Sequence, residues 1–520
     1  MIRAVRNFLD RYPWAPLAVS SFIFLSCYTY QAIQITTQLP LWEDEVLSVW
    51  AAQFPTPAKI NWALAHGLQA SPPVFSVMLH YLGALAGWSN WLMRLPAVAA
   101  ELVNSLLVFL LFKRYMGAAA AAFAACLTLE GLSYFGVQAR PYSLMVLCFT
   151  LALLCWDALN RKRSLPLTIG FCVALIAAIA FHFYSVFYIP SFALMEFLRA
   201  RRTKEWRFGV WAAMFIAGLS LLAWSSVYFP WRHMVAQEVA SSHTYVRKPT
   251  LPSLALSYLY LIIGVGKLDH GSVGPMSTNI VILALTLLLV GMGLAIEKAS
   301  KPEQADTANE THSTDTGSNF DLMLIGLLSV PLIVFLCSLA GPKTYNIRYV
   351  LPAVAGANAL VASSMRGFVV FNRLVPLLLI MAACLTIAIG VPAFEIVEHT
   401  ATYQAMPGNY PIVVAEGSQF IQLTYSSPQQ FRSRLVYLRL PDSVPVADAT
   451  NSHTVERCAR LIPDMPVIDA SAFLAHNARY YVLDDQRTDD TPARYLLQSG
   501  QISPWKQFGK TILYRSNGWQ

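Results

Sequence analysis

Charged residues are scarce in this chain of 520 residues: only 13% are Asp, Glu, Lys or Arg, whereas 56% are hydrophobic. An ordinary globular domain has about 25% charged residues, so the composition excludes that class and indicates a polytopic membrane protein. The formal net charge of +8 arises from Lys and Arg residues scattered in short clusters between apolar runs. Such clusters set orientation in a membrane, and we expect no nucleic-acid partner.

Cysteine is also sparse, and its placement excludes two kinds of site. Seven of the eight cysteines lie in apolar segments and only Cys458 lies in a polar region, with no CxxC pair. The chain therefore carries neither a disulfide framework nor a cysteine zinc motif. It also lacks GxGxxG and Walker sequences, so we expect no nucleotide-binding domain.

Long apolar runs dominate what is present. Residues 14–34 carry no charge and, as a helix rising about 1.5 Å per residue, match a hydrocarbon core of roughly 30 Å. Arg3, Arg6 and Arg11 precede this run and hold its start in the cytoplasm. The run is too long, and too poor in a small-residue cleavage site, for a removed signal peptide. The first loop after this span therefore lies outside.

Hydropathy predicts about eleven spans. They are residues 14–34, 95–112, 117–132, 141–158, 165–181, 184–198, 209–229, 278–296, 321–340, 350–364 and 374–392. Two shorter stretches, 72–88 and 251–266, are predicted as helices at the outer interface, because the basic clusters at 113–114, 161–163 and 199–207 are then all cytoplasmic.

The predicted fold class is an all-α polytopic membrane protein with a small C-terminal α/β soluble domain. Residues 1–394 form the membrane domain, and residues 297–320 read as a disordered cytoplasmic linker. After residue 395 the composition becomes polar, and short β-rich runs ("YPIVVAEG", "RLVYLRL", "RYYVLDD", "KTILYR") alternate with helical patches such as "SAFLAHNA". We place residues 395–520 on the outer face, with a structural or acceptor-docking role.

The stretch "LWEDEVLSVW", residues 41–50, brings three carboxylates to the outer side. As a helix it places Trp42, Val46, Val49 and Trp50 on one apolar stripe resting on the membrane, with Asp44 on the opposite side. One interpretation is that the acidic residues merely cap the helix and complement its dipole. The other is that Asp44 serves as a general base at the membrane surface.

Two arginines stand at outer helix entrances. "VQARPYSL" places Arg140 just before a span, and "YNIRYVLP" repeats the pattern with Arg348 and Tyr349, with Lys343 close by. A guanidinium in this position can bind a phosphate bidentately. Alternatively, it reaches lipid headgroups as an interfacial anchor.

These motifs together resemble the polyprenyl-phosphate-sugar-dependent glycosyltransferases of the GT-C fold. The resemblance rests on the Asp-Glu pair in the first outer loop, a Pro-Pro stretch, "MRLPAVAAELVNSLLVFLLFKRYMG", "QARPY" and "IRYVLP", and covers about residues 35–395. It is nearest to the protein O-mannosyltransferases and to the aminoarabinose and galacturonosyl transferases that modify lipid A. The chain departs from these families in having "SPPV" for His-Pro-Pro-Leu and Ile347 for a proline before Arg-Tyr.

The resemblance implies transfer of a sugar from a polyprenyl-phosphate donor to a hydroxyl of a glycan, lipid or protein acceptor, with inversion. It implies that Asp44 is the base, that Glu45 supports the site, and that Arg140 and Arg348 hold the carrier phosphate. It further implies a multi-pass protein of the bacterial inner membrane whose catalytic loops face the periplasm. The competing interpretations are a transporter or flippase of lipid-linked sugars and a glycan ligase or polymerase.

Other residues complete the predicted substrate site. They are Tyr142, next to Arg140; Glu130, near the outer end of a span; and His182 and Tyr184 in "FHFYSVF". His182 could equally be a satisfied interfacial histidine. Glu101 is an intramembrane carboxylate and hence a functional candidate, or the partner of Arg94 on one helix face. The sequence leaves open whether Asp44 and Glu45 bind a divalent cation.

Overall fold

The computed structural model describes residues 11–241, 249–263, 314–340, 345–389, 405–441, 449–484, 492–508 and 511–519, and isolated positions between 284 and 291. The chain forms two compact units. Unit 1 comprises Met1–Thr37, Arg94–Ala223 and Lys248–Pro392, and unit 2 comprises Gln38–Met93, Trp224–Arg247 and Ala393–Gln520.

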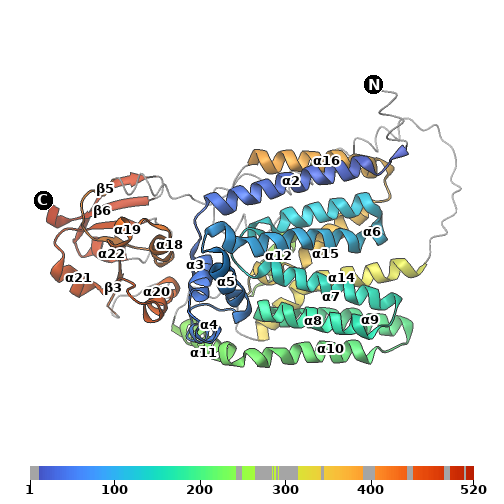
Figure 1. Cartoon of the computed structure of the whole chain (residues 1–520), viewed down its shortest axis with the longest axis horizontal. Helices are drawn as coiled ribbons and strands as arrows, with labels where there is room; N and C mark the ends of the chain where they lie inside the picture. Colours follow the sequence, from blue (N-terminus) through green and yellow to red (C-terminus); the bar gives the residue numbers. More distant parts are fainter. Residues whose placement is uncertain are drawn as a thin grey trace, which may run out of the picture. The chain divides into compact units, whose positions relative to one another are not determined.

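Unit 1 is built from helices that run roughly parallel or antiparallel to one another (Figure 1). In chain order they are α2 (Ala15–Gln38), α6 (Asn90–Gly136), α7 (Tyr142–Arg161), α8 (Leu165–Phe181), η1 (Phe183–Tyr188), α9 (Ile189–Thr203), α10 (Phe208–Leu219), η2 (Ser220–Trp224), α12 (Leu251–Ile263), α14 (Thr314–Ala340), η3 (Ile347–Tyr349), α15 (Ala353–Met365) and α16 (Val369–Ile389). Gly117, at φ 81°, divides α6 into two helices. This division matches the two spans predicted there.

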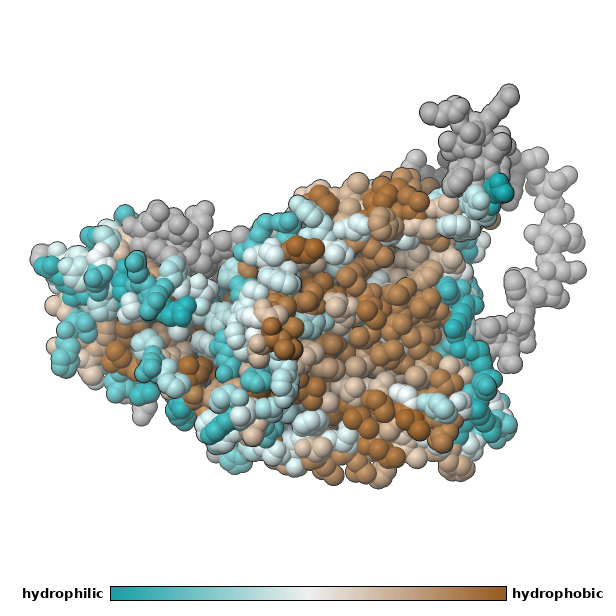
Figure 2. All heavy atoms as spheres, in the orientation of Figure 1, coloured by the Kyte–Doolittle hydropathy of each residue, from teal (hydrophilic) through white to brown (hydrophobic). Residues whose placement is uncertain are grey.

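The surface of unit 1 is apolar along its helices. In Figure 2 hydrophobic residues cover the long helices, and hydrophilic residues gather where the helices end. Phe22 on α2 is 72% exposed and Phe215 on α10 is 67% exposed, as expected for side chains that meet lipid. Among the described residues, six helices are long and apolar enough to cross a membrane. The chain is therefore a multi-pass membrane protein, and the count of eleven spans stays a prediction.

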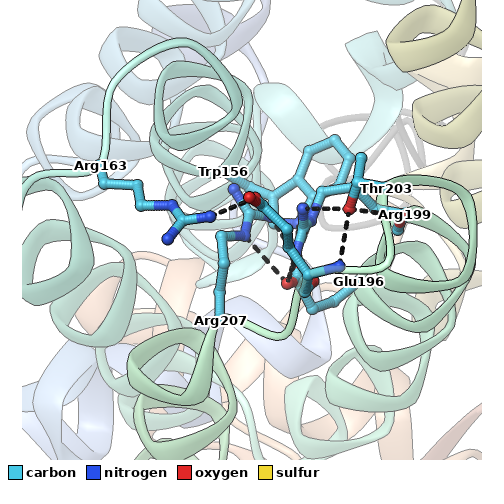
Figure 3. Close-up of polar contacts among 7 residues, drawn as sticks. Trp156, Arg163, Glu196, Arg199, Thr203 and Arg207 are labelled. Atoms are coloured by element: carbon cyan, nitrogen blue, oxygen red, sulfur yellow. Dashed lines mark hydrogen bonds and ion pairs between the residues drawn. The ribbon is translucent and has the colours of Figure 1, made fainter.

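Two ion clusters form at one end of the unit 1 helices. Asp157, at the end of α7, accepts hydrogen bonds from Arg114 (3.2 Å) and from Arg161 (2.7 Å). Near it, Glu196 on α9 is fully buried and pairs with Arg199 at 2.7 Å and with Arg207 (Figure 3). These contacts bring the three predicted cytoplasmic clusters, at 113–114, 161–163 and 199–207, to a single side.

Unit 2 combines short helices with a mixed sheet. The helices before the sheet are α3 (Glu43–Ala52), α4 (Pro57–Ala65), α5 (Pro73–Ala86) and α11 (Ser225–Ser241). Helix α3 packs against α4, α5 and α18 (Gly417–Ser426). Helix α5, predicted to lie at the outer interface, has 14 residues and is about 21 Å long, too short to cross a hydrocarbon core of roughly 30 Å.

Among the described residues, the C-terminal sheet has six strands in the order β3-β2-β1-β4-β6-β5. The strands are β1 (Ile412–Val414), β2 (Leu435–Arg439), β3 (Val467–Asp469), β4 (Tyr481–Asp484), β5 (Ile502–Phe508) and β6 (Thr511–Ser516). The helices among them are α18, α19 (Gln429–Arg432), α20 (Ala449–Leu461), α21 (Ala470–His476) and α22 (Pro492–Gln498), and η4 (Asn517–Trp519) ends the described chain. Strands β3, β2, β1 and β4 are parallel, and β6 joins antiparallel to β4.

The predicted fold class is confirmed: a helical membrane part and a small C-terminal α/β part. All four predicted β-rich runs form strands, and "SAFLAHNA" contains α21. The linker predicted over 297–320 extends too far, because α14 already begins at Thr314. The rest of that segment, residues 297–313, lies outside the described residues. The span predicted over 184–198 is likewise divided, since a 3₁₀ turn precedes α9. The domain boundary near residue 395 also lies outside the described residues.

Candidate functional site

The two arginines predicted at helix entrances meet at one tyrosine in unit 1. Arg140 donates through Nη2 to the hydroxyl of Tyr142 at 3.1 Å, and Arg348 donates through Nη1 to the same hydroxyl at 3.4 Å across 206 positions of sequence. Arg140 and Tyr142 are buried. A phenol hydroxyl is neutral, so these bonds orient both guanidinium groups without cancelling their charge.

Aromatic rings lie beside the guanidinium groups of Arg140 and Arg348. The ring of His182 lies 5.5 Å from that of Tyr142 and 5.8 Å from that of Tyr349, measured between centroids. The rings of Tyr184 and Tyr349 stack at 3.9 Å. Arg348 also lies over the ring of Tyr349, 5.6 Å from its centroid. Six sequence-predicted residues, from three separate segments, therefore form one cluster.

Local backbone structure presents these side chains. Pro141 precedes α7, so Arg140 and Tyr142 flank the beginning of that helix. His182 ends α8, and its Nδ1 accepts a hydrogen bond from the backbone N–H of Tyr184 at 3.3 Å. Each of these residues therefore lies at or next to the end of a helix.

The third segment is held by a short side-chain cap. Asn346 accepts a hydrogen bond from the backbone N–H of Arg348 at 3.1 Å and so starts the 3₁₀ turn η3. The hydroxyl of Tyr188 in η1 donates to the carbonyl of Tyr349 at 2.9 Å. Tyr188 was not among the predicted site residues, although it stands in the same aromatic run as His182 and Tyr184.

The cluster contains two positive charges, those of Arg140 and Arg348. Burial, reinforced by the positive charges of Arg348 and Arg140, lowers the pKa of His182 from 6.5 to about 3. His182 is consequently neutral at physiological pH, and the cationic character belongs to the two arginines. Such an arrangement suits an anion with several acceptor oxygens, of which phosphate is the commonest example.

Three other predicted residues lie apart from this cluster or outside the described residues. Glu130 on α6 accepts a hydrogen bond from Thr386 on α16 at 2.6 Å, which joins two helices. Lys343 lies outside the described residues. Glu101 is buried at 1% exposure. Its side chain and the hydroxyl of Tyr28 both lie against Gly136, since an ideal Cβ built on that glycine is 3.0 Å from the Cγ of Glu101 and 3.2 Å from the hydroxyl of Tyr28.

The acidic helix α3 belongs to unit 2 and differs from its prediction. Asp44 is half-buried, but Glu45 is fully buried and accepts a hydrogen bond from the backbone N–H of Trp42 at 3.1 Å. Leu47 and Ser48 are buried as well as the predicted stripe residues Val46 and Val49. The expectation of one apolar stripe resting on the membrane is therefore wrong, because α3 packs against other helices on several sides.

These contacts divide the roles of the acidic residues. Glu45 caps the helix, as the capping interpretation requires. The hydroxyl of Ser48 donates a hydrogen bond to the backbone carbonyl of Asp44 at 2.9 Å, so this bond does not involve the carboxylate of Asp44. Within the described part of the chain, no group of three or more His, Cys, Asp or Glu side chains suits a metal ion. A divalent cation at Asp44 and Glu45 stays a prediction.

Comparison with known proteins agrees with the resemblance. Residues 70–229 match a family model described as dolichyl-phosphate-mannose-protein mannosyltransferase. This match and the sequence motifs together support a membrane glycosyltransferase of the GT-C class. Comparison with curated protein sequences finds no match.

The similar solved structures include those of two membrane-bound transferases, ArnT and an archaeal oligosaccharyltransferase. The crystal structure of ArnT from Cupriavidus metallidurans bound to undecaprenyl phosphate has a TM-score of 0.45 and 13% identity, covering 96% of this chain and 98% of that chain. The oligosaccharyltransferase of Archaeoglobus fulgidus tethered with an acceptor peptide has a TM-score of 0.41 and 13% identity, covering 92% of this chain and 69% of that chain.

Proposed function

We propose that this protein transfers a sugar from a polyprenyl-phosphate donor to an acceptor hydroxyl at the outer face of the bacterial plasma membrane. The observation that carries the proposal is the convergence of Arg140 and Arg348 on the hydroxyl of Tyr142. Two oriented guanidinium groups among aromatic rings suit the phosphate of a lipid carrier, whose prenyl chain stays in the membrane. The acceptor is a glycan, a lipid or a protein.

The chemistry requires a base and a stabilised leaving group. The acceptor oxygen attacks the anomeric carbon as the bond from that carbon to the phosphate oxygen breaks, which inverts the anomeric centre. Asp44 takes the acceptor proton, and the polyprenyl phosphate leaves with the bonding electron pair. Arg140 and Arg348 stabilise the negative charge that develops on the phosphate. Glu45 contributes by fixing the start of the helix that carries Asp44.

The donor is the feature to test. Purified protein in lipid nanodiscs is offered polyprenyl-phosphate sugars and nucleotide sugars in parallel, and the released polyprenyl phosphate and glycosylated product are followed by mass spectrometry. We expect turnover with the lipid donors alone. Arg140→Ala should raise the KM for the donor at least about tenfold, since a charge-assisted contact contributes about 1.5 to 3 kcal/mol.

Arg232→Ala is the matched control, because Arg232 is exposed on α11. It should leave the donor KM unchanged. Transfer from a nucleotide sugar would contradict the proposal. Movement of the lipid-linked sugar between leaflets without covalent change would favour a transporter instead.

A further inference from the structure

Unit 2 contains a cleft of about 400 Å³ that the transfer chemistry does not use. Four segments line it: α3, α18, α19 and the turn that follows α20. The volume lies within the roughly 300 to 1,000 Å³ of small-molecule sites. The cleft is therefore large enough for one or two sugar rings.

Two aromatic rings form one side of the cleft. Trp50 on α3 and Tyr425 on α18 are partly exposed, and their rings meet edge to face with centroids 6.4 Å apart. Burial raises the pKa of Tyr425 above its usual value of 10, so its hydroxyl remains a hydrogen-bond donor at physiological pH. Partly exposed aromatic faces stack on the C–H face of a sugar ring, and their polar tips bond its hydroxyls.

Polar groups of both signs also line the cleft. Arg432 is exposed and uses Nη2 to hold the carbonyls of Tyr425 and Ser427, each at 3.0 Å. A guanidinium has five N–H donors, so the donors on Nε and Nη1 are separate from this pair. Asp464 is exposed in a left-handed conformation at φ 62°, which Asp adopts more readily than most non-glycine residues.

We propose that this cleft binds a neutral carbohydrate and is the docking subsite for the acceptor glycan, a proposal that rests on the proposed transferase function. The aromatic pair supplies stacking faces, while Arg432 and Asp464 offer one donor and one acceptor side chain with no net charge. This combination selects polyhydroxylated, uncharged ligands over anionic lipids. An extended peptide would instead be recognised by backbone pairing along a strand edge, whereas this cleft is lined by helices and a turn.

Binding is tested on the full-length protein in nanodiscs without donor. Saturation-transfer NMR is recorded with methyl glycosides of glucose, mannose, galactose and N-acetylglucosamine, and with a panel of tripeptides of matched size. We expect transfer to at least one glycoside, lost in Tyr425→Ala and in Asp464→Ala but retained in Tyr425→Phe. Tyr495→Ala and Arg479→Ala, at partly exposed and exposed positions of the same unit outside the cleft, should retain it.

The two proposals fail in different ways. If the wild type transfers sugar, Tyr425→Ala should raise the acceptor KM at least about tenfold and leave the donor KM unchanged. Equal acceptor KM values in wild type and Tyr425→Ala, or saturation of the tripeptides in place of the glycosides, would overturn the carbohydrate cleft. Glycoside binding in a protein that transfers no sugar would support the cleft and contradict the transferase function.

Discussion

The rings of Tyr184 and Tyr349 stack with their centroids 3.9 Å apart and their planes 2° apart. This contact joins η1 to η3, the turn that presents Arg348. A close aromatic pair contributes about 0.5 to 1.5 kcal/mol beyond its buried area. The stack therefore helps to hold η3, together with the hydrogen bonds made by Asn346 and Tyr188.

Removing one ring of this stack tests its positioning role. Tyr184→Ala should destabilise the protein by about 1 kcal/mol and raise the donor KM, because η3 loses the ring that fixes Arg348. Tyr184→Phe keeps the stack and should behave as wild type. Thermal unfolding and donor titration in nanodiscs measure the two effects. An unchanged donor KM in a destabilised Tyr184→Ala protein would show that the stack supports folding stability and does not position Arg348.

Asp44 is expected to be the general base. Asp44→Asn keeps the shape of the side chain but removes the proton acceptor, so turnover should fall by about 10²-fold or more while donor binding survives. Single-turnover kinetics with a lipid donor measure the change. Glu43→Gln, one residue earlier in the same helical turn, is the matched control and should retain turnover. Near-normal rates in Asp44→Asn would show that Asp44 is not the base and that the acidic residues only cap the helix.

His182 should make folding stability depend on pH. Its pKa is lowered from 6.5 to about 3 in the folded protein, so the unfolded chain binds the extra proton first as pH falls. Its contribution to stability is then complete above about pH 6.5 and is lost progressively toward pH 3. We expect the unfolding temperature to fall over this window more steeply in wild type than in His182→Gln. Parallel curves for the two proteins would refute this assignment.

The buried carboxylate of Glu196 should contribute far more to folding stability than an exposed carboxylate does. Glu196→Gln leaves Arg199 and Arg207 without their buried counter-charge (Figure 3) and should cost about 3 to 5 kcal/mol. The control is Glu205→Gln, which removes an exposed pair with Arg163 and should cost about 1 kcal/mol or less. Thermal unfolding of both variants in the same detergent gives the comparison. Equal losses would contradict the buried cluster.

Orientation can be measured by cysteine labelling. The structure gathers the basic clusters at one end of unit 1, and the positive-inside rule makes that end cytoplasmic. In a variant without native cysteines, Lys162→Cys and Arg202→Cys should react with an impermeant reagent only after permeabilisation. Asp464→Cys, in the predicted outer domain, should react in intact cells. Labelling at residue 162 in intact cells would invert the proposed orientation.

The sequence alone determined the features that depend on neighbouring residues. Apolar runs long enough for a bilayer predicted the helical membrane part, and β-branched runs between turn residues predicted β1, β2, β4 and β6. It also identified Arg140 and Arg348 as cations at helix entrances. The strands β3 and β5 were missed. β3 has only two β-branched residues, Val467 and Ile468, before α21 begins at Ala470, and β5 contains Pro504 and a register shift.

Only the tertiary structure decided which distant residues meet. Arg348 donates to the hydroxyl of Tyr142 from 206 positions away, and Arg140 donates to the same hydroxyl. No local pattern encodes this relation. The helix carrying Asp44 became buried because α4, α5 and α18 cover it, although its own sequence suggested one exposed face. The physical reason is the same in both cases: periodicity and propensity act over a few residues, whereas burial and charge pairing depend on how whole elements pack.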